Sequence, residues 1–255
     1  MKYPLLAATL LFAAPSLTAA EGPLKAQAQS LASAHQDSVL FLSAVVEIEL
    51  TAGDNPVKKE ERKVEILGTV IGADGLIVVP LSTLDVASMI DGRSMNGPKG
   101  PVKISAKGTT KEVKILLPDG SEVPAKVAFK DPDLDLAFIR PEKSAAVKLT
   151  PVDIANNAPM AVLDDVIVLG RLGKDLNREP VVMTNEVIAL IHKPRTFGKL
   201  GSQALGMPVF NTAGKFLGLG INRFSAKGDS DSQGPMPSSV VLPAADLVAS
   251  AAQAT

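Results

Sequence analysis

The spacing of apolar residues predicts a chain built from many short β-strands. From Val39 onward, runs rich in Val, Ile and Leu are bounded by polar residues, Gly, Pro and Asp, which commonly end strands. Two Asp-Gly pairs, Asp74–Gly75 and Asp119–Gly120, are typical of tight hairpin turns. The expected strand segments are 39–50, 62–71, 76–81, 112–129, 134–141, 161–170, 178–191, 207–210 and 215–221. This series favours a β-sandwich or a pair of barrels over a parallel α/β sheet.

Five other segments break the strand pattern. The charged run 58–63, KKEERK, predicts a solvated hairpin end, and residues 83–90 predict a short helical turn. Residues 92–108, rich in Gly, Ser, Lys and Pro, predict a long loop, and residues 225–239 predict a flexible one. Pro243, followed by an Ala-rich stretch, predicts a closing helix.

The first 20 residues have the organisation of a secretory signal peptide. Lys2 supplies a basic start, an apolar run follows from Leu5 to Ala14, and small residues precede a cleavage point after Ala20. The run is shorter than the roughly 20 apolar residues that a membrane helix needs. We therefore expect cleavage, a periplasmic or secreted protein, and no stable membrane insertion afterwards. Residues 21–37 then form a short helix or a loose arm before the first strand.

Composition removes several classes of function. The chain has no Cys, so disulfides are excluded and stability must come from burial. Its formal net charge is -1, and loss of Lys2 with the signal peptide takes it to -2, so no general attraction to nucleic acid is expected. The absence of Trp argues against base-stacking platforms or ring-lined carbohydrate clefts.

The segment 203–211, QALGMPVFN, and the run that follows it to Ile221 carry a family resemblance. They resemble the region around the nucleophile of trypsin-like serine proteases, most closely the HtrA/Deg branch, where the pattern reads GNSGGPVFN. The resemblance implies an all-β fold of two six-stranded antiparallel barrels with a C-terminal helix. It places the first barrel at 38–142, a connector at 143–158, and the second barrel with its helix at 159–255. No PDZ domain is expected after it.

The resemblance also places a catalytic triad, and two of its three positions hold the wrong residue. Such a triad needs a hydroxyl nucleophile, an imidazole base and an orienting carboxylate. The histidine position is occupied by Ser82, in the run ADGLIVVPLS, and the nucleophile position by Leu205. Asp135, in DPDLDLAFIR, keeps the carboxylate. Without the family, Ser82 reads as a cap for the short helix, and Asp135 as a brace for backbone amides.

The rest of the expected cleft departs from the family as well. The oxyanion hole would use the backbone amides at Gln203 and Leu205, and Gln203 replaces a glycine there. Gly206 and Met207 are candidate cleft-binding positions, with Met207 replacing a second glycine. We expect a cleft that is filled or reshaped.

Two other kinds of site deserve a test. A shifted nucleophile at Ser202 with His192 as its base is conceivable, since His192 and His35 are the only histidines. His192 belongs to a basic loop, HKPRTFGK, which also suggests contact with an anionic partner. The spacing of Asp131, Asp133, Asp135 and Glu142 resembles a calcium loop, but Leu136 stands where that loop requires glycine, so no metal and no cofactor are expected.

The sequence therefore predicts an exported pseudoprotease that binds an envelope protein or an extended peptide without cleaving it. One alternative is an active HtrA-like serine endopeptidase with a relocated site. Another is a structural subunit of an envelope assembly, which would associate with itself as a homo-oligomer.

Overall fold

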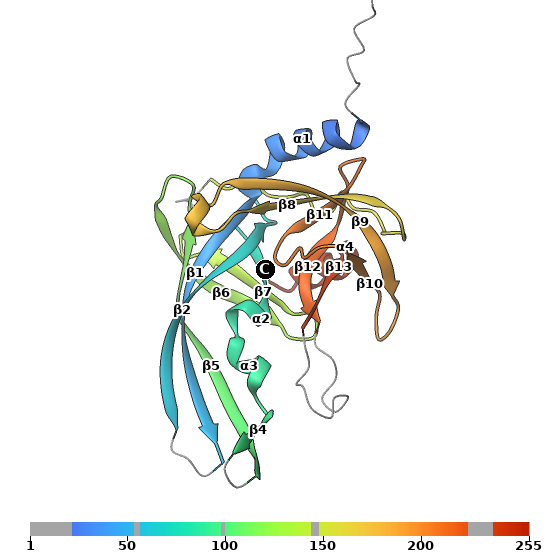
Figure 1. Cartoon of the computed structure of the whole chain (residues 1–255). Coiled ribbons are helices and arrows are strands. Elements are labelled where there is room, and N and C mark those ends of the chain that lie inside the picture. Colours follow the sequence, from blue (N-terminus) through green and yellow to red (C-terminus); the bar gives the residue numbers. More distant parts are fainter. Residues whose placement is uncertain (1–21, 54–56, 98–99, 144–147, 224–236, 255) are drawn as a thin grey trace, which may run out of the picture.

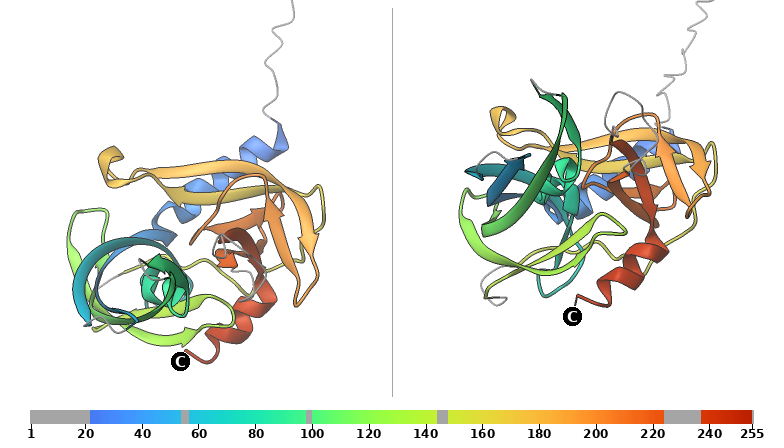
Figure 2. Two further views of the ribbon diagram at one scale, coloured as in Figure 1. Left: turned by 60° about the horizontal axis from the view of Figure 1, so that its bottom comes forward. Right: turned by 90° about the horizontal axis from the view of Figure 1, so that it is seen from below.

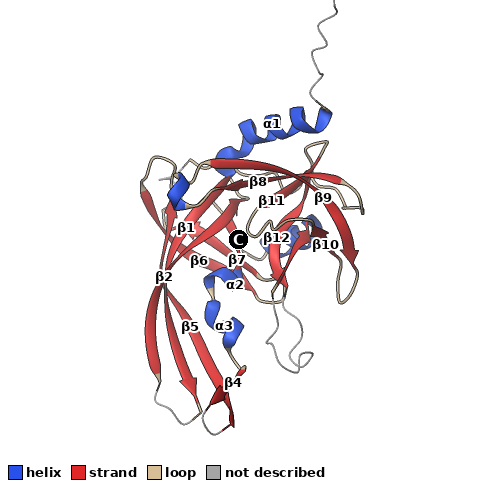
Figure 3. Cartoon of the chain, in the orientation of Figure 1, coloured by secondary structure: helices blue, strands red, loops and turns tan. Residues whose placement is uncertain are grey.

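The structure, a computed structural model, describes residues 22–53, 57–97, 100–143, 148–223 and 237–254. Two closed antiparallel barrels of six strands each lie side by side, as Figures 1 and 3 show. The predicted all-β class, the two six-stranded barrels and the C-terminal helix are confirmed. None of the helices among the described residues is long and apolar enough to cross a membrane.

The first barrel closes through the pairing of β1 with β5. Around the barrel its strands run in the order β1 (Val39–Ala52), β2 (Lys58–Val70), β3 (Ile77–Pro80), β7 (Leu136–Pro141), β6 (Glu122–Asp131) and β5 (Gly100–Leu116). A short strand, β4 (Ser94–Gly97), pairs with the start of β5 outside the barrel. Two short helices, α2 (Leu81–Leu84) and α3 (Val86–Ile90), follow β3.

Strands β1, β2 and β5 extend beyond the barrel as a long twisted ribbon, seen at the lower left of Figure 1. The charged run 58–63 is exposed, as predicted, but it forms the start of β2 and does not separate two strands. The prediction of a loop at 92–108 was wrong, because most of this segment is β4 and β5. Half-buried Val102, Ile104 and Ala106 alternate with exposed Lys and Ser residues, which is the period of a strand. The Gly and Lys content of the segment concealed this alternation.

The second barrel is closed in the order β10 (Phe197–Leu200), β13 (Ser238–Pro243), β12 (Phe216–Arg223), β11 (Pro208–Asn211), β8 (Asp165–Arg171) and β9 (Pro180–Ile191). The short strands β10 and β13 were not expected from the sequence. The closing helix α4 covers Ala244–Ala251, with Pro243 as its N-cap residue. Most of the segment expected as a flexible loop, 225–239, lies outside the described residues.

The arm before the first strand is a helix, α1 (Pro23–His35), followed by a 3-10 turn, η1 (Gln36–Ser38). Buried Ala28 and Leu31 pack this helix against β8 and β9 of the second barrel. Figure 2 shows α1 lying across one side of that barrel and α4 on another. The end of α1 leads directly into β1, so the helix ties the entry of the first barrel to the second.

A shared apolar core joins the barrels. One buried cluster contains Phe138 from β7 together with Phe210 and Phe216 from β11 and β12, and two further clusters fill the individual barrels. Between the barrels, the Thr69 hydroxyl donates to the carbonyl oxygen of Gly206 at 2.9 Å. The barrels therefore hold each other in one arrangement, and this arrangement shapes the site between them.

Candidate functional site

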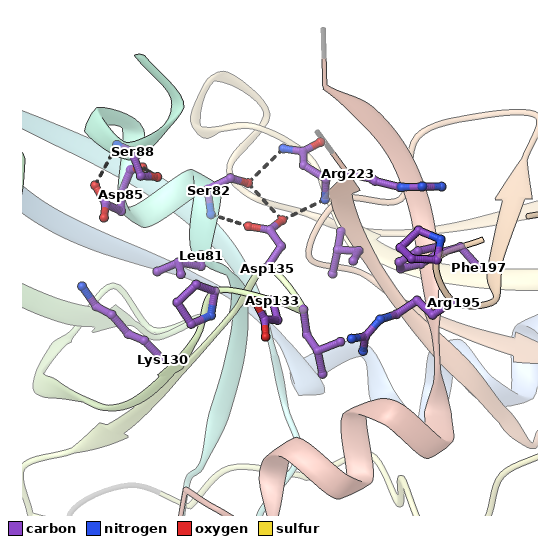
Figure 4. Close-up of a pocket in the computed structure, with 15 residues that line it drawn as sticks. Leu81, Ser82, Asp85, Ser88, Lys130, Asp133, Asp135, Arg195, Phe197 and Arg223 are labelled. Atoms are coloured by element: carbon purple, nitrogen blue, oxygen red, sulfur yellow. Dashed lines mark hydrogen bonds between the residues drawn. The ribbon is translucent and has the colours of Figure 1, made fainter. Parts of the chain in front are cut away.

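A cavity of about 720 Å³ lies between the barrels. Its walls come from α2, the start of α3 and the β6–β7 turn in the first barrel, and from the β9–β10 turn and the end of β12 in the second. Figure 4 shows the side chains that face it. The apolar part of the lining consists of Leu81, Pro132, Leu134, Pro194, Phe197 and Ile221.

The carboxylate of Asp135 lies in the wall of this cavity and joins the two barrels. Its Oδ1 accepts the backbone N–H of Ser82 at 2.6 Å, and its Oδ2 accepts the Ser82 hydroxyl at 3.0 Å. Oδ2 also accepts the backbone N–H of Asn222, from β12, at 2.9 Å. The side-chain amide of Asn222 then donates to the Ser82 oxygen at 3.1 Å. Figure 4 shows these bonds as dashed lines, with the Ser82 hydroxyl beside the carboxylate.

Burial raises the pKa of Asp135 to about 6, because the charged form loses hydration. The hydrogen bonds from Asn222 and Ser82 act in the opposite direction and are too weak to cancel the effect. Asp135 also has a left-handed backbone, with a φ of 56°, and its carbonyl oxygen accepts the N–H of Leu81 at 2.8 Å. The surrounding bonds therefore hold both the backbone and the side chain of this residue.

The prediction that Ser82 caps the short helix was wrong. Ser82 is the second residue of α2, whose N-cap is Pro80, and its side chain is buried against Asp135 and Asn222. Its hydroxyl both donates and accepts, so it satisfies the two polar groups next to it. A neutral serine hydroxyl is far too weak a base to accept a proton near neutral pH, so Ser82 cannot act as the base of a triad.

Leu205 lies against β12 through a bridge with Gly220, two residues before Asn222. It is half-buried and has no protonatable atom. The backbone amides of Gln203 and Leu205 donate no hydrogen bond within the described part of the chain. Gly206 is buried against Leu67 of β2, and Met207 packs on Gly170 of β8. The structure thus brings Ser82 and Asp135 together, whereas Gly206 and Met207 are not among the residues that line the cavity.

Among the described residues, neither histidine is hydrogen-bonded to an accessible hydroxyl. His35, at the end of α1, stacks on Phe210 and contacts the fully buried Ser38, and burial lowers its pKa. His192 follows β9 and Ser202 follows β10, and the pairings Phe197↔Ile191 and Leu200↔Val187 put them at opposite ends of β10. A four-residue strand is ~13 Å long. The amide of Asn185 donates to the Ser202 hydroxyl instead.

The acidic residues that suggested a calcium loop diverge. Asp131 accepts hydrogen bonds from Ser250 of α4 and from the N–H of Leu134, whereas Asp133 is exposed and Asp135 faces Ser82. The described residues contain no group of three or more His, Cys, Asp or Glu side chains placed to hold a metal.

Sequence reasoning missed Asn222, which supplies two of the hydrogen bonds around Asp135 and Ser82. An asparagine at the end of a predicted apolar strand was visible in the chain. Its partner lies 87 residues earlier, in the other barrel, and only the packing of the barrels brings them together.

Solved structures with this fold include two proteases. The chain matches the MamO protease domain from Magnetospirillum magneticum (apo form) with a TM-score of 0.51 and 16% identity, over 85% of this chain and 96% of that one. It matches a variant of the HtrA-type protease AlgW with a tripeptide at a TM-score of 0.54 and 15% identity, over 89% of this chain. In that comparison it spans 62% of the longer chain. No curated protein sequence matches.

One family model covers more than half of the molecule. The trypsin-like peptidase domain matches residues 68–219, which contain β3, β7, the Ser82–Asp135 pair and Leu205. This sequence match and the pair of six-stranded barrels agree, and the chain belongs to the trypsin-like peptidase family.

Proposed function

We propose that this protein is a non-catalytic member of its family that binds an extended peptide or protein segment between its barrels. The observation that carries the proposal is the hydrogen-bonded set of Asp135, Ser82 and Asn222. In an active triad the carboxylate orients an imidazole. Here the carboxylate of Asp135 accepts hydrogen bonds from the Ser82 hydroxyl and from the backbone amides of Ser82 and Asn222.

Loss of the nucleophile supports the same proposal. Leu205 offers no oxygen or sulfur for attack on a carbonyl, and among the described residues the one hydroxyl that is hydrogen-bonded to a histidine is that of the fully buried Ser38. A covalent acyl intermediate needs both a nucleophile and a base within hydrogen-bond reach. The relocated pair Ser202 and His192 does not meet that requirement.

The cavity supports binding. It combines apolar walls with a few polar groups, which is the usual chemistry of a ligand site, and its volume of about 720 Å³ suits several residues of an extended chain. The signal-like segment 1–20 supports export, so an envelope protein or peptide is the partner that we propose.

Binding can be tested with fluorescein-labelled, unfolded casein and the mature protein, by fluorescence anisotropy. Ser88→Trp is the blocking variant, because exposed Ser88 lines the cavity and an indole there would occupy it. Thr184→Trp on the exposed face of β9 is the matched control. We expect binding that Ser88→Trp weakens at least fivefold and Thr184→Trp leaves unchanged. Equal binding by all three proteins would exclude the cavity as the binding site.

A further inference from the structure

Basic residues gather on the second-barrel rim of the cavity. His192, Lys193 and Arg195 come from the β9–β10 turn, and Arg223 ends β12 beside them. None of the four forms an ion pair with a carboxylate among the described residues. The sequence marks this loop as basic, and the fold brings it to the edge of the cavity.

Arg223 holds this rim in place. Its guanidinium donates to the carbonyl oxygen of Lys193 at 2.9 Å and lies 5.2 Å from the centre of the Phe197 ring. These two contacts fix the β9–β10 turn against β12. The turn that carries Arg195 is therefore held by Arg223 at Lys193, before Arg195, and at Phe197, after it.

Arg195 is the side chain of this rim that faces the cavity without a partner among the described residues. It is half-buried, lines the cavity, and makes no hydrogen bond or ion pair with any residue that the structure describes. In Figure 4 its guanidinium points from the turn toward the cavity. A partly desolvated cation without a counter-ion is unfavourable until an anion approaches, and a guanidinium offers a carboxylate two parallel donors.

The carboxylates of the cavity are engaged, with one exception. Asp135 accepts three hydrogen bonds, and Asp85 accepts the N–H of Ser88 at 3.2 Å. Asp133, on the opposite wall, is exposed and forms no ion pair with Arg195. Lys130 of β6 is also exposed, forms no ion pair within the described segments, and adds a cation to the first-barrel rim. Among the described residues that line the cavity, Arg195 and Lys130 are the cations, and Asp133 the carboxylate, without a side-chain hydrogen bond or an ion pair.

We propose that the cavity selects extended peptides that carry an acidic side chain, whose carboxylate pairs with Arg195. The inference rests on the proposed function and adds the chemical class of the bound segment. Lys130 contributes to the same preference from the other rim, and Asp133 opposes it. Arg195 is accordingly the residue that determines specificity.

The test uses three fluorescein-labelled nonapeptides that differ only in a central Glu, Gln or Lys, and anisotropy titrations at pH 7.5. With the unaltered protein, the Glu peptide should bind about three- to tenfold more tightly than the Gln peptide, and the Lys peptide most weakly. In 1 M salt the differences should vanish, because the screening length falls to about 3 Å. Arg195→Glu should reverse the order, and Asp133→Asn should increase the preference for Glu.

Lys174→Glu is the matched control, since Lys174 is exposed in the 3-10 turn η3 (Lys174–Leu176), outside the cavity lining. It should keep the original order. Equal affinities for the three peptides, or an order that Arg195→Glu does not reverse, would overturn the charge preference while leaving the proposed function standing. Absence of binding by every peptide and by casein would overturn both.

Discussion

At the scale of single residues, the site is built around a carboxylate whose hydrogen-bond partners are a serine hydroxyl and two backbone amides. Asp135 is held by backbone amides of Ser82 and Asn222 and by the Ser82 hydroxyl, so it links α2 with β12. An unpaired buried carboxylate would be costly, and these donors offset part of that cost. Ser82, Asn222 and Asp135 therefore form a polar network whose hydrogen bonds run among its own three residues.

The raised pKa of Asp135 predicts a particular pH dependence of stability. The pKa is about 6 in the folded protein against 3.8 for an unperturbed Asp, so the folded state binds the proton more tightly. The contribution of this group is fully present below pH 4 and is lost as the pH rises through about 6. In urea unfolding between pH 4 and pH 7, the unaltered protein should lose stability relative to Asp135→Asn.

Asparagine suits this comparison, because it tolerates the φ of 56° and does not titrate. The informative quantity is the difference in the free energy of unfolding between the two proteins at each pH. A difference that stays constant, or that grows in favour of the unaltered protein as the pH rises, would show that the hydrogen bonds outweigh burial.

Resemblance to the family predicted the positions of two of the three residues in this network. The run before Ser82 and the DPDLDLAFIR stretch around Asp135 placed two members of the network by resemblance. It could not supply Asn222, since that contact depends on how two barrels pack. It also suggested that Met207 would face the cleft, whereas the small Gly170 on β8 accommodates its side chain.

At the scale of secondary-structure elements, the β8–β9 hairpin clamps the entry of the first barrel. Arg171, at the end of β8, donates to the carbonyl oxygens of Gln36, Val39 and Arg178 and pairs with Asp37. Only 7% of its side chain is exposed. The planar guanidinium reaches acceptors in several directions, which a lysine ammonium cannot do in the same geometry.

Arg171→Lys should therefore destabilise the protein by about 2–4 kcal/mol, because hydrogen bonds of a buried charged group contribute about 1.5–3 kcal/mol each. Urea unfolding followed by circular dichroism gives the value. Arg62→Lys is the control, since Arg62 pairs with Glu60 on an exposed strand and should change stability by less than about 0.5 kcal/mol. If Arg171→Lys lowered the free energy of unfolding no more than Arg62→Lys does, Arg171 would not hold the entry of the first barrel.

The sequence predicted best the strands that are buried on at least one face. Strands such as β3 and β7 are continuous apolar runs buried on both sides, and both were expected. The outer part of β2 is exposed on both faces, so its charged residues carry no alternation. β10 has only four residues and follows a basic loop, and its position is set by pairing with β9 and β13.

At the scale of the whole molecule, one glycine sets how closely the barrels approach. Gly206 has a φ of 75°, and a Cβ added there would lie 2.3 Å from the carbonyl oxygen of Leu67 in the first barrel. Gly206→Ala should push the barrels apart and cost about 2–4 kcal/mol of unfolding free energy, through backbone strain and this contact. It should also lower casein affinity, since the cavity lies between the barrels.

Gly173→Ala is the control, because a Cβ there meets nothing within 4 Å and its φ is −67°. That change should stay within about 0.5 kcal/mol. Thermal unfolding of both variants separates the two cases. Equal stability of Gly206→Ala and the unaltered protein would mean that the barrels are not held in contact at this point.

The most direct test of the account is turnover. Purified mature protein is incubated overnight with unfolded casein, and released peptides are quantified by mass spectrometry, with Ser202→Ala and His192→Ala variants alongside. The account predicts no release above the buffer blank, because Leu205 cannot attack and Asp135 has no imidazole to orient. Release that either substitution abolishes would show that a relocated catalytic site exists and that the protein is an active peptidase.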